Sequence, residues 1–150
     1  MKKFASLIKT LDSTNKTNLK VGALSNYFLK SSNDDVLWAI ALMSHRRPKR
    51  PITTTLLRQW ASDDSNLPQW LFEESYHIVG DLAETISLLV TQDDSSSKIS
   101  LTDCINEIIA LRDKSDEEKK IYILKRWKGF NNYERFVFNK ILTGGFRIGI

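Results

Sequence analysis

The sequence predicts an all-α fold, a compact domain of about nine helices. Three observations support this prediction. Apolar residues recur at intervals of three and four along most of the chain. Residues that cap helices precede many of these stretches, and the alternating patterns typical of strands are scarce. With 150 residues, of which 41% are apolar, the chain has the length of a single domain with a proper core.

Three helices are expected in the first part of the chain. The first, residues 2–11, presents one apolar face: Phe4, Leu7, Ile8 and Leu11. The second covers residues 17–29, and Ser31, Ser32 or Asn33 then supplies an N-cap for the third. Residues 36–43 are all apolar, which is typical of a helix at the centre of a core. A buried strand is the alternative for so short a run.

Prolines organise the next stretch. Pro48 and Pro51 exclude a continuous helix through the residues around them. Thr53 is a candidate cap for a helix that runs through Trp60, and residues 63–66 are expected to form a turn. Pro68 is suited to the start of the following helix.

A long apolar stripe follows, with spacings of three and four: Phe72, Tyr76, Val79, Ala83, Ile86 and Val90. Gly80 interrupts this stripe. Either one helix passes through Gly80, or Asp81 caps a second helix with Glu84 three residues later. Residues 92–97, with two aspartates and three serines, are expected to form a flexible loop.

The last three helices have clear starting signals. Ser100 begins a helix whose inward residues are expected to be Leu101, Ile105, Ile108 and Ile109. Ser115 and Glu118 have the spacing of a capping box, followed inward by Ile121, Leu124 and Trp127 until Gly129 ends the helix. Asn131 or Asn132 begins the final helix, with an inward set of Tyr133, Phe136, Val137 and Ile141.

The net charge of +4 is strongly segregated along the chain. Residues 45–60 carry five bases and no acid, whereas residues 61–97 carry eight acids and no base. Residues 119–150 carry eight bases and one acid. This pattern favours a side that faces a polyanion and an opposite acidic side. The alternative is that the charges are scattered over a solvated surface.

Four bases lie close together in the proline-containing stretch: Arg46, Arg47, Lys49 and Arg50. Pro48 and Pro51 stiffen this stretch, which lowers the entropy lost when it is ordered. A rigid row of cations suits several phosphates at once. The alternative is again a set of solvated charges.

A second candidate site ends the sequence, where the last helix runs into Gly144 and Gly145. Helices commonly stop at a left-handed glycine, so either residue is a natural end. The second glycine allows another group to approach the backbone closely. Arg147, followed by Gly149, offers a planar fork of donors suited to phosphate oxygens. Bare amides beside an arginine would grip a phosphate. The alternative is a helix cap with a solvated arginine.

Other residue types give weaker signals. A base-stacking role is conceivable for tryptophans, but a core position is favoured for all four: Trp38, Trp60, Trp70 and Trp127. His45 and His77 lack a visible nucleophile or orienting acid, and Glu73 and Glu74 diverge on a helix. Cys104 is expected to be a core thiol, and a single cysteine suits a reducing, cytoplasmic compartment. Neither a zinc site nor a membrane-spanning run is visible.

Three stretches together resemble the N-terminal, all-helical DNA-binding domain of bacterial ATP-dependent DNA ligases. They are residues 138–149, which include Thr-Gly-Gly-Phe-Arg-Ile-Gly; residues 45–61; and residues 67–85. The resemblance implies that residues 1–150 hold nicked duplex DNA for ligation in replication, repair or recombination. It also implies that Gly144, Gly145, Arg147 and Gly149 grip backbone phosphates in the minor groove near the nick.

In such ligases a lysine in a Lys-x-Asp-Gly motif is adenylated, with ATP and Mg²⁺ as cofactors. No Asp-Gly pair occurs in this chain. We therefore expect a fragment that is incomplete at its C-terminus, without catalytic residues, metal or cofactor of its own. It would act as a monomer beside the nucleotidyltransferase and oligonucleotide-binding domains of a parent ligase. The alternative is a helical protein–protein interaction module that uses the acidic segment, residues 61–97.

Overall fold

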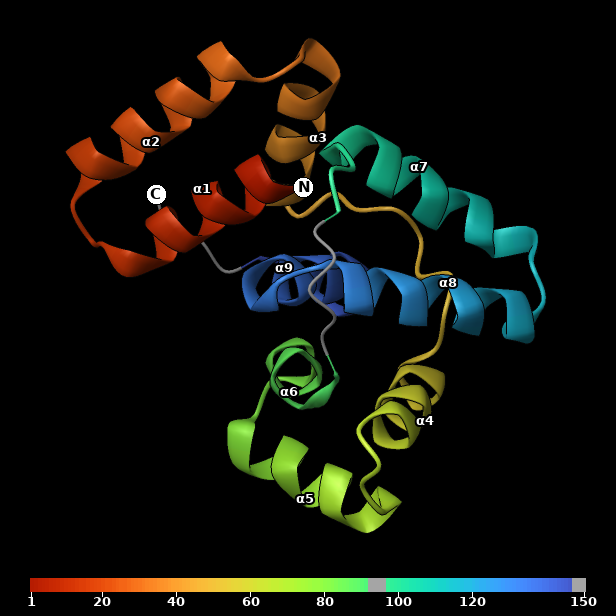
Figure 1. The fold of residues 1–150 in the computed structure, drawn as a ribbon. Coiled ribbons are helices and arrows are strands. Elements are labelled where there is room, and N and C mark those ends of the chain that lie inside the picture. The colour runs from red at the N-terminus through yellow and green to blue at the C-terminus, as the bar shows by residue number, and fades with distance from the viewer. Residues whose placement is uncertain (92–96, 147–150) are drawn as a thin grey trace.

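The computed structural model describes residues 1–91 and 97–146, and within these ranges every regular element is helical (Figure 1). The elements are α1 (Lys2–Ser13), α2 (Thr17–Lys30), α3 (Asn33–Met43), α4 (Thr54–Asp64), α5 (Gln69–Val79), α6 (Leu82–Leu89), α7 (Leu101–Ala110), the 3-10 helix η1 (Leu111–Asp113), α8 (Asp116–Gly129) and α9 (Asn132–Thr143). The predicted all-α fold with about nine helices is confirmed.

Helix α9 is the centre of the arrangement. It packs against α6 on one side and α1 on the other. Figure 1 shows α1, α2, α3 and α7 on one side of α8 and α9, and α4, α5 and α6 on the other. The two sides are therefore joined mainly through the helix that leads into the glycine-rich end of the chain.

Buried polar side chains fix α9 against its neighbours. The Trp127 indole N–H donates to Asn139 Oδ1 at 2.8 Å, and the Asn139 amide donates to the Ala83 carbonyl at 3.5 Å. Arg135 donates to the Val90 carbonyl at 3.0 Å. Because buried polar groups are costly when unpaired, these bonds specify how α6, α8 and α9 meet.

Most of the predicted helix starts are confirmed by side-chain caps. Six N-cap residues accept a hydrogen bond from a backbone amide in the first turn: Ser32, Thr53, Asp81, Ser100, Ser115 and Asn131. The stripe through Gly80 is two helices, because Gly80 has φ 84° and ends α5 before Asp81 begins α6. The 63–66 turn was placed too early: α4 continues to Asp64, and the turn follows it.

The expectation for residues 36–43 is only half right. They form a helix and not a strand, but α3 is not central: Ala39 and Leu42 are buried, whereas Leu37 is 65% and Ile40 44% exposed. Helix α3 packs mainly against α7 and α2, and the face that carries Leu37 and Ile40 is open to solvent. An all-apolar sequence identifies a helix without identifying which face is covered.

Two inward assignments in the second half of the chain are wrong. Ile109 is 47% and Ile121 68% exposed. On α8 the buried pair is Ile123 and Trp127, four residues apart, so the packed face is turned away from Ile121. Of the loop predicted at residues 92–97, residues 92–96 lie outside the described residues, and Ser97 is described and is not helical. Within the described ranges, no helix has both the length and the apolar character needed to cross a bilayer.

A candidate nucleic-acid interface

The basic loop, residues 45–51, begins with a tight end to α3. The Arg46 amide donates to the Ala41 carbonyl at 2.8 Å and the His45 amide to the Leu42 carbonyl at 3.1 Å. This pair of bonds defines a Schellman motif, in which the first residue after the C-cap is left-handed. His45 occupies that position with φ 64°, where glycine is usual and a β-carbon costs about 1 kcal/mol. As predicted, the loop that contains Pro48 is not helical.

Two arginines of the basic loop reach the C-terminal end of α9. Arg50 Nη2 donates to the Thr143 carbonyl at 2.8 Å, and Arg47 Nη1 donates to the Leu142 carbonyl at 3.3 Å. Carbonyls in the last turn of a helix have no partner within the helix, and the helix dipole favours cations there. Burial and the neighbouring Arg50 lower the pKa of Arg47, but a guanidinium remains charged at any physiological pH.

The end of α9 differs from the expected left-handed glycine. Helix α9 ends at Thr143, and Gly144 follows in an extended conformation with φ −170°. The left-handed stop predicted there is therefore wrong, because the arginines of the basic loop cap the last carbonyls instead. The Gly144 amide still donates to the Lys140 carbonyl at 3.0 Å, so it is not available to a ligand.

The second glycine does permit a close approach, and the group that approaches is His45. A β-carbon added at Gly145 would lie 3.1 Å from His45 Nδ1, closer than an ordinary van der Waals contact. The next residue, Phe146, is buried and packs edge-on against Phe4, with ring centroids 5.7 Å apart. The glycine segment, Gly144–Phe146, is therefore held between the basic loop and α1.

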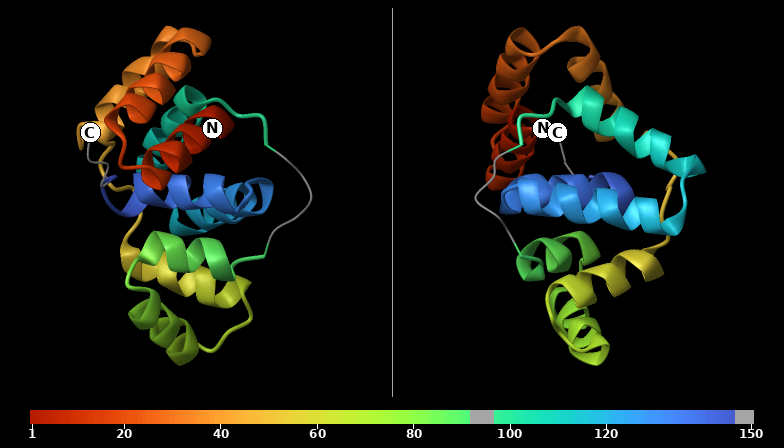
Figure 2. Two further views of the ribbon diagram at one scale, coloured as in Figure 1. Left: turned by 90° about the vertical axis from the view of Figure 1, so that its left-hand side faces the viewer. Right: turned by 45° about the vertical axis from the view of Figure 1, so that its right-hand side comes forward.

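The remaining two bases of the loop point into solvent. Arg46 and Lys49 are exposed and make no hydrogen bond or ion pair with the residues that the structure describes. In the left view of Figure 2 the segment after α3 and the C-terminal end of α9 lie side by side at the left edge of the molecule. The structure therefore brings the basic loop next to the exposed Gly145, with Arg47 half-buried and Arg46, Lys49 and Arg50 exposed. Arg147 and Gly149 lie outside the described residues.

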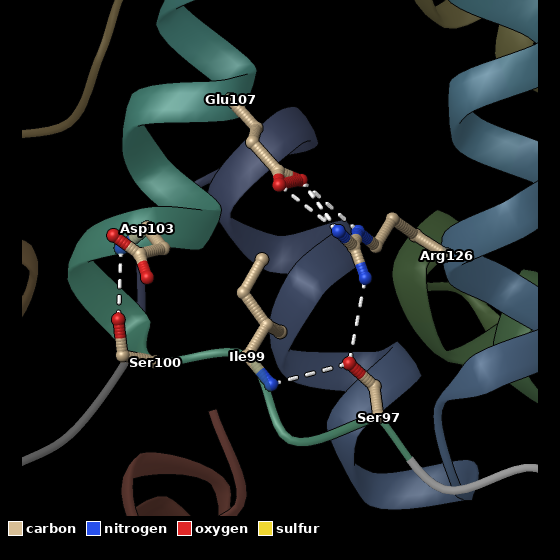
Figure 3. A network of polar contacts seen from close by, with 6 residues as sticks. All are labelled: Ser97, Ile99, Ser100, Asp103, Glu107 and Arg126. Carbon is tan, nitrogen blue, oxygen red and sulfur yellow. Dashed lines mark hydrogen bonds and ion pairs between the residues drawn. The ribbon is translucent and has the colours of Figure 1, made fainter.

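The basic, tryptophan-containing stretch of α8 is not part of this surface. Trp127 is fully buried, as the core interpretation predicted. Arg126 forms a two-pronged ion pair with Glu107 of α7, with distances of 2.7 and 2.9 Å, and also donates to Ser97 (Figure 3). This pair ties α8 to α7, and Arg126 is occupied by it.

The other tryptophans are divided between core and surface. Trp60 is buried, and Trp38 is partly buried against the core. Trp70 is 67% exposed on α5, so the core assignment is wrong for this residue. It lies on the side of α8 and α9 that faces away from α1 and α2 (Figure 1), and it does not join the candidate surface.

Three of the six described acids of the acidic segment form ion pairs with bases from other parts of the chain. Glu73 pairs with Arg58 at 3.3 Å. Asp63 and Asp81 pair with lysines of α8 and α9, at 4.0 and 2.6 Å. Asp64 accepts the amide of Thr91. These contacts bring the segregated charges together within the molecule, which weakens the case for a partner that reads the acidic segment.

The remaining candidates have no catalytic arrangement. Cys104 is buried, and this burial raises the pKa of its thiol to about 12, as an inert core residue would show. His77 is exposed on α5. Among residues 1–91 and 97–146, no three His, Cys, Asp or Glu side chains are grouped so that they could hold a metal ion.

Sequence reasoning selected the bases of the loop but missed their two different roles. Arg47 and Arg50 bond to carbonyls that lie more than ninety residues away along the chain. No local sequence pattern predicts such a contact. A weak signal for His45 does exist, because a non-glycine residue ends α3 immediately before a basic run.

Comparison with known proteins gives one finding. The family model described as DNA ligase N terminus matches residues 1–150. No curated protein matches the chain. The family match covers the basic loop, α9 and the glycine segment together.

Proposed function

Because the chain belongs to the family of DNA ligase N-terminal domains, we propose that it binds duplex DNA at a nick and positions that nick for ligation. One observation carries the proposal: Arg47 and Arg50 fasten the basic loop to the end of α9, beside the glycine segment. The two stretches with phosphate-binding character are thereby combined in a single surface. A surface formed before binding loses little entropy when it meets its ligand.

The contacts divide the bases of the loop into two groups. Arg46 and Lys49 are exposed and face solvent, so they are the phosphate contacts of the loop. Arg47 and Arg50 hold the surface together and add to its positive potential. In the glycine segment the Gly145 amide has no acceptor among the described residues, and it lies immediately before the stretch that contains Arg147 and Gly149. Those two residues lie outside the described ranges, and we propose on the family resemblance alone that they also contact phosphates.

The proposed contacts are directed at the DNA backbone. Guanidinium, ammonium and amide donors bind phosphate oxygens in any sequence. The described surface presents no organised set of amide side chains for reading base edges. Binding should therefore depend on duplex form and on the presence of a nick, and only weakly on sequence.

The nucleotide chemistry of ligation is assigned to other domains of a parent ligase. The chain contains no Lys-x-Asp-Gly motif, and the described residues offer no metal site. The residues present do not fit an adenylation site for ATP and Mg²⁺. Incubation with labelled ATP should give no covalent AMP adduct, and a stoichiometric adduct would overturn this assignment.

Fluorescence anisotropy with nicked and intact duplexes tests the proposal. Each neutralised phosphate contributes about −0.9 to the slope of log affinity against log salt, so Arg46, Lys49 and Arg147 should give roughly −3. Nicked duplexes of unrelated sequence should bind with similar affinity at one salt concentration. A slope near zero would refute phosphate binding, and a preference of more than about a hundredfold for one sequence would indicate base readout.

A further inference from the structure

His45 combines an unfavourable backbone conformation with a specific side-chain contact. Only two non-glycine residues in the described ranges have positive φ, His45 and Asn66. Asparagine and histidine enter the left-handed region more often than other non-glycine residues, but the conformation still costs about 1 kcal/mol relative to glycine. Such strain persists where the surroundings impose it, and it is frequent at functional sites.

The contact lies on the proposed DNA surface. The His45 ring meets the backbone of Gly145, and any β-carbon at residue 145 would come within 3.1 Å of Nδ1. The left-handed turn at His45 also sets the direction in which the chain leaves α3 toward Arg47 and Arg50. The residue therefore contacts one half of the surface with its side chain and directs the other half with its backbone.

We propose that His45 is a positioning residue for DNA binding, whose imidazole holds the glycine segment in register with the phosphate-binding side chains of the basic loop. This inference rests on the proposed function, because it concerns the geometry of the same surface. His45 itself need not touch DNA. Its contribution is to place the Gly145 backbone at a constant position relative to Arg46 and Lys49 before DNA arrives.

The substitution His45→Gly distinguishes a positioning role of His45 in DNA binding from a role in ending α3 alone. If the residue only ends α3, glycine is the better choice, since it adopts the left-handed conformation without a steric cost. His45→Gly should then be neutral or favourable for both stability and binding. A positioning role predicts unchanged or higher thermal stability together with weaker DNA binding. His45→Asn keeps a side chain and the left-handed turn. It therefore serves as a control for the extra backbone flexibility that glycine introduces.

The experiment is a double-mutant cycle on affinity for one nicked duplex, with His45→Gly, Gly145→Ala and the double variant. Each single variant should weaken binding by roughly threefold to tenfold, as expected for residues in contact. In the double variant the added methyl group no longer meets the ring, so Gly145→Ala should add little. In wild-type protein without DNA, nuclear Overhauser contacts between the His45 ring protons and the Gly145 α-protons should be present.

The outcomes separate the two proposals. Wild-type protein without salt-dependent affinity for any duplex would overturn the proposed function and this inference with it. If wild-type protein binds DNA but the fold-losses of His45→Gly and Gly145→Ala simply multiply in the double variant, the inference alone is overturned. Normal binding by both His45→Gly and His45→Asn would overturn it as well. Loss of affinity at unchanged melting temperature, coupled to residue 145, is the expected result.

Discussion

Removing the two solvent-facing bases of the basic loop should weaken DNA binding by a calculable amount. The side chains of Arg46 and Lys49 are exposed and form no hydrogen bond or ion pair with the described residues, so Arg46→Gln/Lys49→Gln should leave the fold intact. Each lost phosphate contact reduces the salt slope by about 0.9. Extrapolated from 1 M to 0.15 M salt, that slope corresponds to about fivefold in affinity for one contact and about thirtyfold for both.

The control must lose the same charge elsewhere. Lys2→Gln/Lys98→Gln also removes two positive charges, from a shared cavity near the start of α1 and α7. In the left view of Figure 2, the segment that precedes α7 lies at the edge opposite the basic loop. Because long-range attraction is screened beyond about 10 Å in 0.1 M salt, this double variant should lose much less affinity.

Fluorescence anisotropy with a nicked duplex at several salt concentrations measures both variants, and thermal unfolding verifies that each is folded. Equal losses in the two double variants would show that only net charge matters, and the assignment of Arg46 and Lys49 would be refuted. An unchanged salt slope in Arg46→Gln/Lys49→Gln would refute it as well. Arg50→Gln offers a useful contrast: it removes a cap of α9, so it should lower the melting temperature, which Arg46→Gln should not.

Three further predictions concern stability. Burial raises the pKa of Glu134, and its Oε2 has no described partner, so Glu134→Gln should stabilise the fold at pH 7. The gain should shrink as the pH falls through the raised pKa toward 4.5, where wild type is also protonated; a gain independent of pH in denaturant unfolding would contradict this. Asn139→Ala removes the acceptor for Trp127 and should cost about 2–4 kcal/mol, and a loss under about 1 kcal/mol would argue against that bond. A β-carbon has open space at both Gly80 and Gly22. Gly80→Ala should therefore destabilise by about 1 kcal/mol through its φ of 84°, and Gly22→Ala within α2 should stabilise by a similar amount, whereas shifts of the same sign in thermal unfolding would contradict the backbone argument.

Features that depend on a few neighbouring residues were predictable without coordinates. A capping side chain bonds an amide two or three positions ahead, so Thr53, Ser100 and Ser115 could be read directly from the chain, and the cap at Ser32 was narrowed to three neighbouring residues. The prolines of the basic loop likewise exclude a helix by their own covalent structure. The same local character made the row of bases at 46–50 a visible candidate for phosphate binding.

Which face of a helix is buried depends on its neighbours, and here sequence was an incomplete guide. The apolar run of α3 predicted a helix but not that Leu37 and Ile40 would face solvent. On α8 the pattern pointed to Ile121, whereas packing selected Ile123. A stripe of apolar residues wider than the available contact leaves the choice of face to the elements around it.

In the candidate site, too, the sequence indicated which residues are present, and the tertiary structure decided what they contact. Its residue types were evident from the chain, but their roles were not: Arg47 and Arg50 cap a helix that begins about eighty residues later, and His45 contacts Gly145 across one hundred residues. Such contacts form only when α9 packs between α1 and α6, because this packing places the C-terminal end of α9 next to the basic loop. Hydrogen bonds between distant segments are decided by that packing, because no local conformational preference extends beyond a few residues along the chain.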